Sequence, residues 1–304
     1  MEDKIFEKLK EELPGIQKGI LLKDYTTFKI GGPAKYFLIA ETKEELAGAV
    51  KAAKKFKLPV FVLGGGSNLL VLEKGFKGLV IKVQNSEFRI LNSKKIFVSA
   101  GLSLSELSDL AAENGFKGFE WSSGIPGTAG GAIFGNAQAF GDKISDSLEK
   151  VEVLNIKNLA LKNLSKEQCK FSLKSSIFKK NKNLIIISAV FAPEKGDKEE
   201  IQQKTKKFLN YRKNNHPMSF PSAGSAFVNP EKKGEIIRAG SLIEKCGLKG
   251  KKIGGAQISE QHANFIVNLG NARAKDVLAL IKLAQKKVKG KFGVLLKTEI
   301  QILK

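Results

Sequence analysis

The sequence is poor in the residues that build disulfides and metal sites. It contains 2 cysteines and 2 histidines among 304 residues, and the cysteines, Cys169 and Cys246, are far apart in the chain. Disulfide-rich scaffolds and structural zinc sites need more of these side chains at close spacing. We therefore predict a protein of a reducing compartment with no metal site.

Long apolar segments are also lacking. No stretch approaches the roughly 20 apolar residues that a membrane-spanning helix requires. Residues 1–12 are charged and helix-like, without the apolar core of a signal peptide. Hydrophobic residues make up 42% of the chain and charged residues 27%, as in ordinary globular proteins. These features predict a cytoplasmic protein with no membrane partner.

Arginine is scarce although the chain is strongly basic. The net charge is +22, yet arginine occurs only at Arg89, Arg212, Arg238 and Arg273, and the lysines are dispersed. Arginine is the side chain that grips phosphate and reads bases most specifically. We interpret the lysines as a solvated surface and predict no nucleic-acid partner. A basic nucleic-acid-binding protein is kept as an alternative, because 20 phenylalanines leave base stacking open.

Helix and strand patterns alternate along the chain and indicate an α+β or α/β protein. Thr42 with Glu45, and Ser103 with Glu106, are capping boxes that begin two helices. A third helix is predicted over Val277–Val288. Strands are predicted at about 36–39, 60–63, 79–83, 96–99, 151–155, 184–191, 264–267 and 294–303.

Two further segments are distinguished by composition. Ser122–Gly141 is rich in Gly, Ala and Ser, and its small side chains predict neither a packed helix nor a strand. Pro193–Glu200 is polar and resembles a linker that leads to a C-terminal unit.

Two dense glycine loops are the main chemical signal. The first, Gly64-Gly65-Gly66-Ser67-Asn68, follows a predicted buried strand, and the second is Gly124-Ile125-Pro126-Gly127-Thr128-Ala129-Gly130-Gly131. Neither has the spacing of a P-loop or of a dinucleotide-binding Rossmann turn. Glycine lets successive backbone N–H groups surround a bulky anion. One such loop alone is more simply a turn, but two together favour a pyrophosphate-containing ligand.

Six motifs follow one another in a fixed order along the chain. They read TTFKIGGPA at 26–34, GGGSNLL at 64–70, GIPGTAGGAIFGNA at 124–137, PSAGSAFVNP at 221–230, LIEKCGLKG at 242–250 and GGAQISEQHANFIVN at 254–268. Several motifs in one order are far more specific than any single one. By these motifs the chain resembles bacterial UDP-N-acetylenolpyruvoylglucosamine reductases of the shorter structural type, from about Tyr25 to Ile300.

The resemblance implies an α+β fold and an FAD-dependent activity. An N-terminal helical segment, 1–24, would precede an FAD-binding domain, 25–196, built from subdomains of about 25–84 and 85–196 and similar to the vanillyl-alcohol-oxidase type. A smaller substrate-binding domain would cover 197–304. The family uses NADPH and FAD to reduce UDP-N-acetylglucosamine enolpyruvate to UDP-N-acetylmuramate in peptidoglycan precursor synthesis. We expect a monomer.

The resemblance also assigns roles to single residues. Ser225, in the AGS motif, would be the proton donor, and Glu299 would polarise the substrate or relay protons. Lys174 would stabilise negative charge on the intermediate. The glycine loops would bind FAD through Gly64, Gly65, Gly66, Ser67, Asn68, Gly124, Ile125, Pro126, Gly127, Thr128, Gly130 and Gly131. Arg212 and Asn229 would contact the substrate. Taken alone, Ser225 is a turn residue, Glu299 a residue on a solvated strand face, and Lys174 a surface lysine.

Several positions depart from the family pattern. Leu173 and Lys174 replace a typical Tyr-Arg pair, so a point cation stands where a two-pronged guanidinium is usual. Other departures are Gln138, Phe140, Asn215, His216 and Gln261. They leave open another FAD-dependent oxidoreductase of the same fold, or a flavin-binding homologue with weak or no turnover.

Overall fold

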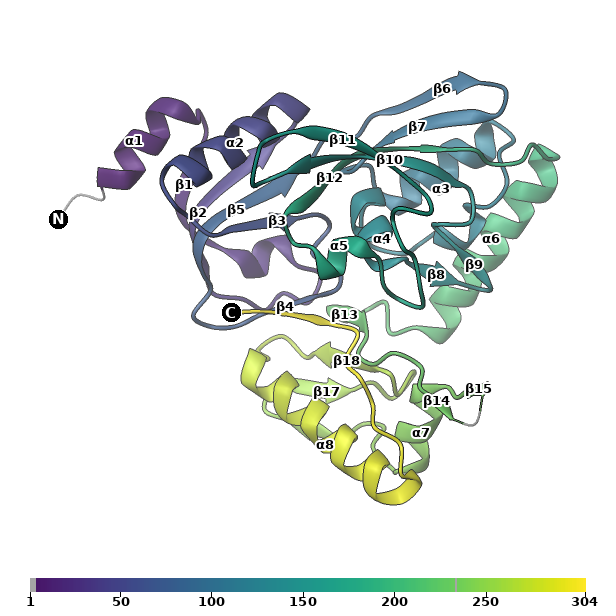
Figure 1. Cartoon of the computed structure of the whole chain (residues 1–304). Helices are drawn as coiled ribbons and strands as arrows, with labels where there is room; N and C mark the ends of the chain where they lie inside the picture. Colours follow the sequence, from purple (N-terminus) through teal and green to yellow (C-terminus); the bar gives the residue numbers. More distant parts are fainter. Residues whose placement is uncertain (1–3, 233) are drawn as a thin grey trace. The chain divides into compact units, whose positions relative to one another are not determined.

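The computed structural model describes residues 4–232 and 234–304 and divides into two compact units. The first unit comprises residues 1–20, 34–65 and 77–210, and the second comprises 21–33, 66–76 and 211–304. Figure 1 labels their helices and strands. Residues 1–3 of the predicted N-terminal segment lie outside the described residues. None of the described helices is long and apolar enough to cross a bilayer.

The first sheet of the first unit carries the first glycine loop at the end of a strand. Its strand order is β1-β2-β5-β3, and β3 and β5 run parallel. Its elements are α1 (Lys4–Glu12), β1 (Gln17–Leu21), β2 (Pro33–Ala40), α2 (Lys43–Lys55), β3 (Val60–Leu63) and β5 (Phe76–Val83). The capping box at Thr42 and Glu45 begins α2, as the sequence predicts. Buried apolar side chains of α2 then pack on the sheet, and the larger ones, Leu46 and Val50, each contribute about 1.5–3 kcal/mol relative to exposure.

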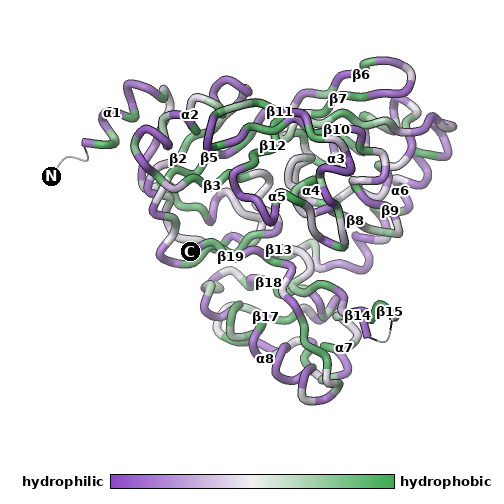
Figure 2. The backbone as a smooth tube through the Cα atoms, viewed as in Figure 1, coloured by the Kyte–Doolittle hydropathy of each residue, from purple (hydrophilic) through white to green (hydrophobic). Residues whose placement is uncertain are grey.

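The second sheet of this unit is antiparallel, with the order β11-β10-β12-β7-β6. Its strands are β6 (Phe88–Asn92), β7 (Lys95–Ser99), β10 (Leu148–Asn155), β11 (Leu161–Ser165) and β12 (Leu184–Phe191). The accompanying short elements are α3 (Leu104–Glu113), η2 (Glu120–Ser122), α4 (Ala129–Gly135), β8 (Gln138–Ala139), β9 (Asp142–Lys143) and α5 (Ile177–Lys180). Ser103 begins α3 as predicted, and its side chain accepts the Glu106 N–H, but the reciprocal bond of the predicted capping box is not formed among the described residues. Figure 2 shows hydrophobic residues concentrated along these central strands.

The glycine- and alanine-rich segment 122–141 differs from its prediction, because it contains the helix α4. A Cβ on Gly130 would lie 2.8 Å from the Cβ of Ala100. The small side chains therefore mark a helix that packs unusually close to its neighbour.

The predicted linker at 193–200 is also more structured than expected. Lys117 donates to Glu194, Gly196 donates to Gly115, and α6 (Lys198–Asn215) begins directly afterwards. The chain passes from the first unit to the second inside α6, after residue 210.

The second unit has its own sheet and core. The sheet order is β13-β18-β17-β16, all antiparallel, and α8 packs against β16 and β17 (Figure 1). Its elements are η1 (Leu22–Tyr25), β4 (Leu69–Val71), β13 (Ser222–Ser225), β14 (Glu231–Lys232), β15 (Glu235–Ile236), α7 (Ala239–Lys245), β16 (Lys252–Ile253), β17 (Ala256–Ile258), β18 (Phe265–Asn268), α8 (Ala274–Phe292) and β19 (Gln301–Leu303). Phe28, Ile30 and Leu70 join this core from the N-terminal part of the chain.

The last predicted strand, 294–303, is a regular strand only at Gln301–Leu303, where it pairs parallel to β4. The preceding residues pair with the loop after β13 through a single bridge, Phe227–Thr298. Buried and exposed residues alternate from Val294 to Lys297. The alternation then ends, because Lys297 and Thr298 are both exposed. Glu299 is thereby half-buried instead of lying on a solvated strand face.

Gly75 provides a test of the second unit. Its φ is +66°, and a Cβ there would lie 1.8 Å from the Pro33 carbonyl oxygen. We expect Gly75→Ala to lower the free energy of unfolding by about 1–3 kcal/mol or more, measured by thermal and denaturant unfolding. Gly290→Ala, in α8 with nothing near the added Cβ, is the matched control and should be neutral or stabilising. Equal stability of both variants would contradict the close packing at Gly75.

Candidate functional site

The two glycine loops meet in the first unit. A Cβ on Gly65 would lie 2.6 Å from the Cα of Gly127, and one on Gly64 would lie 2.6 Å from Thr128 Oγ1. Thr128 in turn caps α4 by accepting the Gly131 N–H. The residues in contact leave no room for a side chain at either glycine, so the contact itself accounts for the residue type. The sequence predicts both loops, but not that they touch.

Backbone donors gather at this contact. The N–H groups of Gly64, Gly65 and Gly127 donate to no group in the described part of the chain. All three residues are half-buried. Adjacent backbone N–H groups without a protein acceptor form an anion-binding concavity. These donors fit the pyrophosphate of a dinucleotide such as FAD.

Lys174 lies on a tight turn of the same unit and not on a free surface loop. Ser172 and Ser175 exchange two backbone hydrogen bonds of 3.0 and 3.1 Å across it, and Lys174 itself has φ +53°. Its side chain is half-buried, and Lys179 Nζ donates to its carbonyl oxygen at 2.7 Å. The backbone therefore holds Lys174 in one conformation.

Asn136 ties this turn to the second glycine motif. It follows α4 in a left-handed conformation, and its Nδ2 donates to the Ser172 carbonyl oxygen at 2.9 Å. Its Oδ1 is buried and has no hydrogen-bond partner among the described residues. Sequence reasoning missed Asn136, although an asparagine directly after Gly135 is a typical signal for a left-handed helix end.

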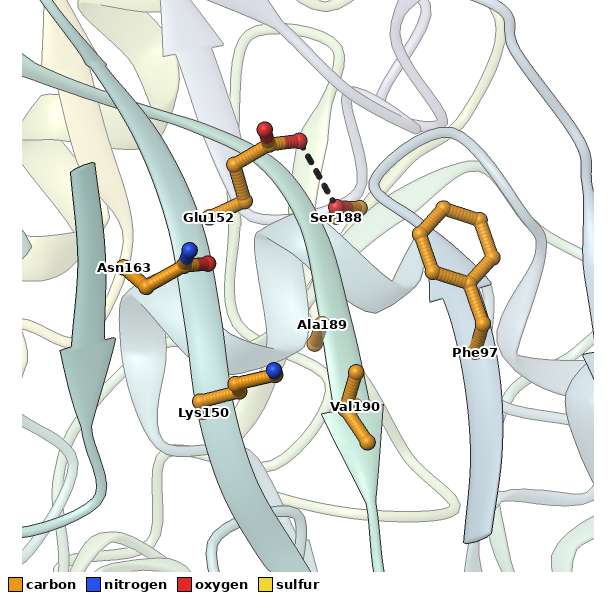
Figure 3. Close-up of a pocket in the computed structure, with 7 residues that line it drawn as sticks. All are labelled: Phe97, Lys150, Glu152, Asn163, Ser188, Ala189 and Val190. Atoms are coloured by element: carbon orange, nitrogen blue, oxygen red, sulfur yellow. Dashed lines mark hydrogen bonds between the residues drawn. The ribbon is translucent and has the colours of Figure 1, made fainter. Parts of the chain in front are cut away.

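A depression of about 210 Å³ lies on the face of the second sheet, and Lys150, Glu152 and Ser188 are among the residues that line it (Figure 3). Ser188 Oγ donates to Glu152 Oε2 at 3.2 Å, and Lys43 forms an ion pair with the same carboxylate. None of the residues lining it belongs to a glycine loop. Its carboxylate, Glu152, is already bonded to Lys43 and Ser188, and none of the predicted site residues lines the depression.

The second unit holds the remaining part of the first glycine loop, Gly66–Asn68. Thr27 donates its backbone N–H to the Gly66 carbonyl oxygen, and its Oγ1 donates to the Ser222 carbonyl oxygen at 2.7 Å. Asn68 Nδ2 donates to the Glu299 carbonyl oxygen at 3.2 Å. Three motifs that are far apart in the sequence are thus hydrogen-bonded into one cluster.

Ser225 and Glu299 come close through their backbones. The Glu299 N–H donates to the carbonyl oxygen of Ala226, the residue after Ser225. Ser225 is half-buried at the end of β13, and its Oγ makes no hydrogen bond to the described residues. A hydroxyl that no protein group uses is available to a ligand.

Asn264 holds the loop that follows Ser225. Its Nδ2 donates to the Phe227 carbonyl oxygen at 2.9 Å, and its Oδ1 accepts the Phe227 N–H at 3.1 Å. Asn264 is buried, and its two hydrogen bonds fix the loop that follows Ser225. Sequence reasoning quoted the motif around Asn264 without assigning it a role.

Arg212 is a buried cation of the second unit, and the half-buried rings of His216 and His262 lie in the same unit. The Arg212 side chain is 7% exposed, and burial lowers its pKa to about 10. Burial, together with the charge of Arg212 and the neighbouring His262, lowers the pKa of His216 to about 4. The His216 and His262 rings lie 5.6 Å apart, edge to face. The neutral His216 ring therefore lies near a buried cation, and a buried cation suits an anionic substrate group.

Asn229 has a structural contact as well as its predicted contact with substrate. Its Oδ1 accepts the Ala239 N–H at 2.9 Å at the beginning of α7. The side chain is exposed, and its amide N–H groups make no hydrogen bond to the described residues. These N–H groups are the part of Asn229 that suits a ligand.

The lowered pKa of His216 predicts a pH-dependent stability. An ordinary histidine has a pKa of about 6.5, so below that pH His216 is protonated in the unfolded chain. In the folded chain His216 stays neutral until the pH approaches about 4. The stabilisation from neutral His216 is therefore complete above pH 6.5 and is lost as the pH falls towards 4. We expect His216→Gln to lose less unfolding free energy than wild type between pH 7 and pH 5. With 2 histidines in the chain, NMR can follow each ring, and equal pH slopes would contradict the assignment.

Comparison with known proteins identifies both parts of the chain. A model described as an FAD binding domain matches residues 34–158. A model described as UDP-N-acetylenolpyruvoylglucosamine reductase, C-terminal domain, matches residues 216–303. The reductase of Caldanaerobacter subterraneus subsp. tengcongensis is 44% identical, and the match covers 100% of this chain and 99% of that protein. The Bacillus subtilis reductase is 39% identical over 99% and 98% of the two chains.

A solved structure gives the same result for the fold. The crystal structure of the UDP-N-acetylenolpyruvylglucosamine reductase from Thermus caldophilus superposes with a TM-score of 0.79 at 37% identity, over 95% of this chain and 100% of that one. The predicted α+β fold with an FAD-binding part is confirmed. The chain belongs to the UDP-N-acetylenolpyruvoylglucosamine reductase family of FAD-dependent oxidoreductases.

Proposed function

We propose that this chain uses NADPH and FAD to reduce UDP-N-acetylglucosamine enolpyruvate to UDP-N-acetylmuramate, in peptidoglycan precursor synthesis in the cytoplasm. The observation that carries the proposal is the meeting of two glycine loops whose half-buried amides have no protein acceptor. FAD bound there supplies the hydride transfer, which no side chain of the chain can perform. The family assignment names the reaction to which this site is suited.

The domain organisation is part of the proposal. We assign FAD binding to 25–196, in subdomains of about 25–84 and 85–196, and substrate binding to 197–304. The segment 1–24 precedes them. The match of the FAD-binding model to 34–158 and of the reductase model to 216–303 supports this division. We expect the chain to act as a monomer on its small-molecule substrate.

The cofactor residues are proposed from both loops. The amides of Gly64, Gly65 and Gly127 would donate to the pyrophosphate of FAD, since such groups favour anions. The other members of the predicted set are Gly66, Ser67, Asn68, Gly124, Ile125, Pro126, Thr128, Gly130 and Gly131. Of these, Thr128 and Gly130 shape the helix α4 behind the loop.

The catalytic roles follow from the charge that the reaction creates. Adding a hydride to the terminal vinyl carbon places negative charge on the neighbouring carbon and its carboxylate. Lys174 would stabilise that charge as a rigidly held cation. Ser225, whose hydroxyl no protein group uses, would deliver the proton. Glu299 would orient the carboxyl end of the substrate or relay the proton.

Substrate binding is assigned to the second unit. Arg212 is a buried cation near the neutral His216 ring, and it would bind a phosphate or carboxylate of the substrate. The free amide N–H groups of Asn229 would donate to the same molecule. Both residues belong to the part of the chain at or next to the reductase C-terminal match.

The first test is an anaerobic two-step spectrum of the full-length holoprotein. We expect NADPH to bleach the yellow flavin absorbance, and UDP-N-acetylglucosamine enolpyruvate to restore it promptly. NADH in place of NADPH tests the nucleotide preference. Bleaching without recovery would indicate another acceptor or a homologue that lacks the second half-reaction. A protein that holds no flavin would overturn the proposal.

Substitution of Lys174 separates the two half-reactions. Lys174→Met should slow the recovery step by about 10²–10³-fold, because one charge-stabilising group is removed. Bleaching by NADPH should be unchanged, since that step creates no charge on the substrate. Lys174→Arg should retain most of the rate. Lys180→Met, at an exposed position of the same segment, is the matched control. A Lys174→Met protein with wild-type recovery would remove Lys174 from the catalytic set.

A further inference from the structure

Lys82 has an unusual position among the many lysines of the chain. It lies near the end of β5, and the parallel register places it opposite Leu63, the residue before Gly64. Its Nζ donates to the Gly64 carbonyl oxygen at 2.9 Å and, at 3.4 Å, to its own neighbour Val83. The ammonium group is thus hydrogen-bonded to the backbone of the first glycine loop within the first unit.

The charge of Lys82 is not neutralised by the protein. No carboxylate of the described residues forms an ion pair with it, and its acceptors are two backbone carbonyl oxygens. The side chain is half-buried. Burial lowers the pKa of Lys82, and no neighbouring charge contributes to that shift. Removing an ammonium group from water without a counter-ion is costly even when its burial is partial, and a bound anion would offset that cost.

An anion that compensates the Lys82 ammonium group would lie beside the backbone amides of the first glycine loop. Gly64, whose oxygen accepts the Lys82 bond, is also one of the residues whose amides have no protein acceptor. In a trans peptide the N–H points away from the carbonyl, so the Gly65 N–H is directed away from the Gly64 oxygen that accepts from Lys82. A cation on one side of this peptide and an amide on the other suit a pyrophosphate, which carries two negative charges. Lys82 and the glycine contact lie within one unit, so their geometry does not depend on the other unit.

We propose that Lys82 is a cofactor-binding residue whose ammonium group supplies the positive charge opposite the FAD pyrophosphate and holds the Gly64 carbonyl away from it. This rests on the glycine loops being the pyrophosphate site, as proposed above. Lys82 acts through the loop, so it tunes affinity for the anion and takes no part in hydride or proton transfer. Its substitution therefore changes FAD retention before it changes turnover.

A purely structural role for Lys82 makes a different prediction. A neutral amine still donates a hydrogen bond to the Gly64 carbonyl oxygen, so a simple tether works at any protonation state. Compensation of phosphate charge requires the ammonium form. The dependence of FAD binding on alkaline pH therefore separates the two roles.

The test measures FAD dissociation from full-length holoprotein by flavin fluorescence, from pH 7 to pH 10.5. Lys82→Met should weaken FAD binding by roughly 10- to 100-fold, the range of a hydrogen bond to a charged group. Wild type should lose affinity as the pH rises through a value below that of an ordinary lysine. Lys82→Met should lack that step, and Lys82→Arg should restore affinity with a flat profile. Lys77→Met, exposed on the same strand, should bind within about twofold of wild type.

Each outcome decides between the alternatives. If Lys82→Met retains wild-type affinity, or the variant weakens binding but keeps the wild-type pH profile, the proposal is overturned. If Lys82→Met does not fold, Lys82→Arg decides by itself, because a wild-type alkaline step in that variant excludes the charge role. Gly65→Ala tests the glycine loops independently of Lys82, with Gly135→Ala, where nothing meets the added Cβ, as its control. Wild type without bound FAD would contradict the proposed function instead.

Discussion

Gly65 approaches Gly127 so closely that Gly65 cannot carry a side chain. This contact joins the end of β3 to the beginning of α4, and Leu104 at the beginning of α3 adds a hydrogen bond to the Gly127 carbonyl oxygen. The end of a parallel strand pair is a common place for ligands in α/β sheets, because polar backbone groups are left over there. In the rest of the first unit, side-chain caps at Thr42 and Ser103 fix where α2 and α3 begin.

Local rules in the sequence account for much of the fold. The caps at Thr42 and Ser103, the buried strand before Gly64 and the amphipathic pattern of α8 follow from short-range chemistry, and the structure has them. The helix α4 could not be predicted this way, because its small residues are explained by a neighbour, Ala100, that is distant in the sequence. Pairing of the segment before Gln301 with the loop after β13 is equally non-local.

In the candidate site, too, some features can be predicted from the local sequence and others depend on residues that are distant in the chain. The two glycine loops are visible in the sequence because glycine has few other reasons to cluster. The rigidity of Lys174 is not visible, because it depends on Asn136 and on the turn between Ser172 and Ser175. Likewise, the half-buried state of Glu299 depends on its bond to Ala226. Family resemblance identifies such residues without explaining them, whereas the hydrogen bonds give the physical reason.

The second unit is assembled from three separate parts of the chain, 21–33, 66–76 and 211–304. Phe28, Ile30 and Leu70 therefore belong to a core whose other members are synthesised more than a hundred residues later. During translation these early segments emerge with apolar side chains that have no partner until the ribosome has nearly finished. A fragment cut at residue 211 would likewise lack part of its own interior. Each unit packs around its own core, but the order of their residues makes them inseparable as genetic modules.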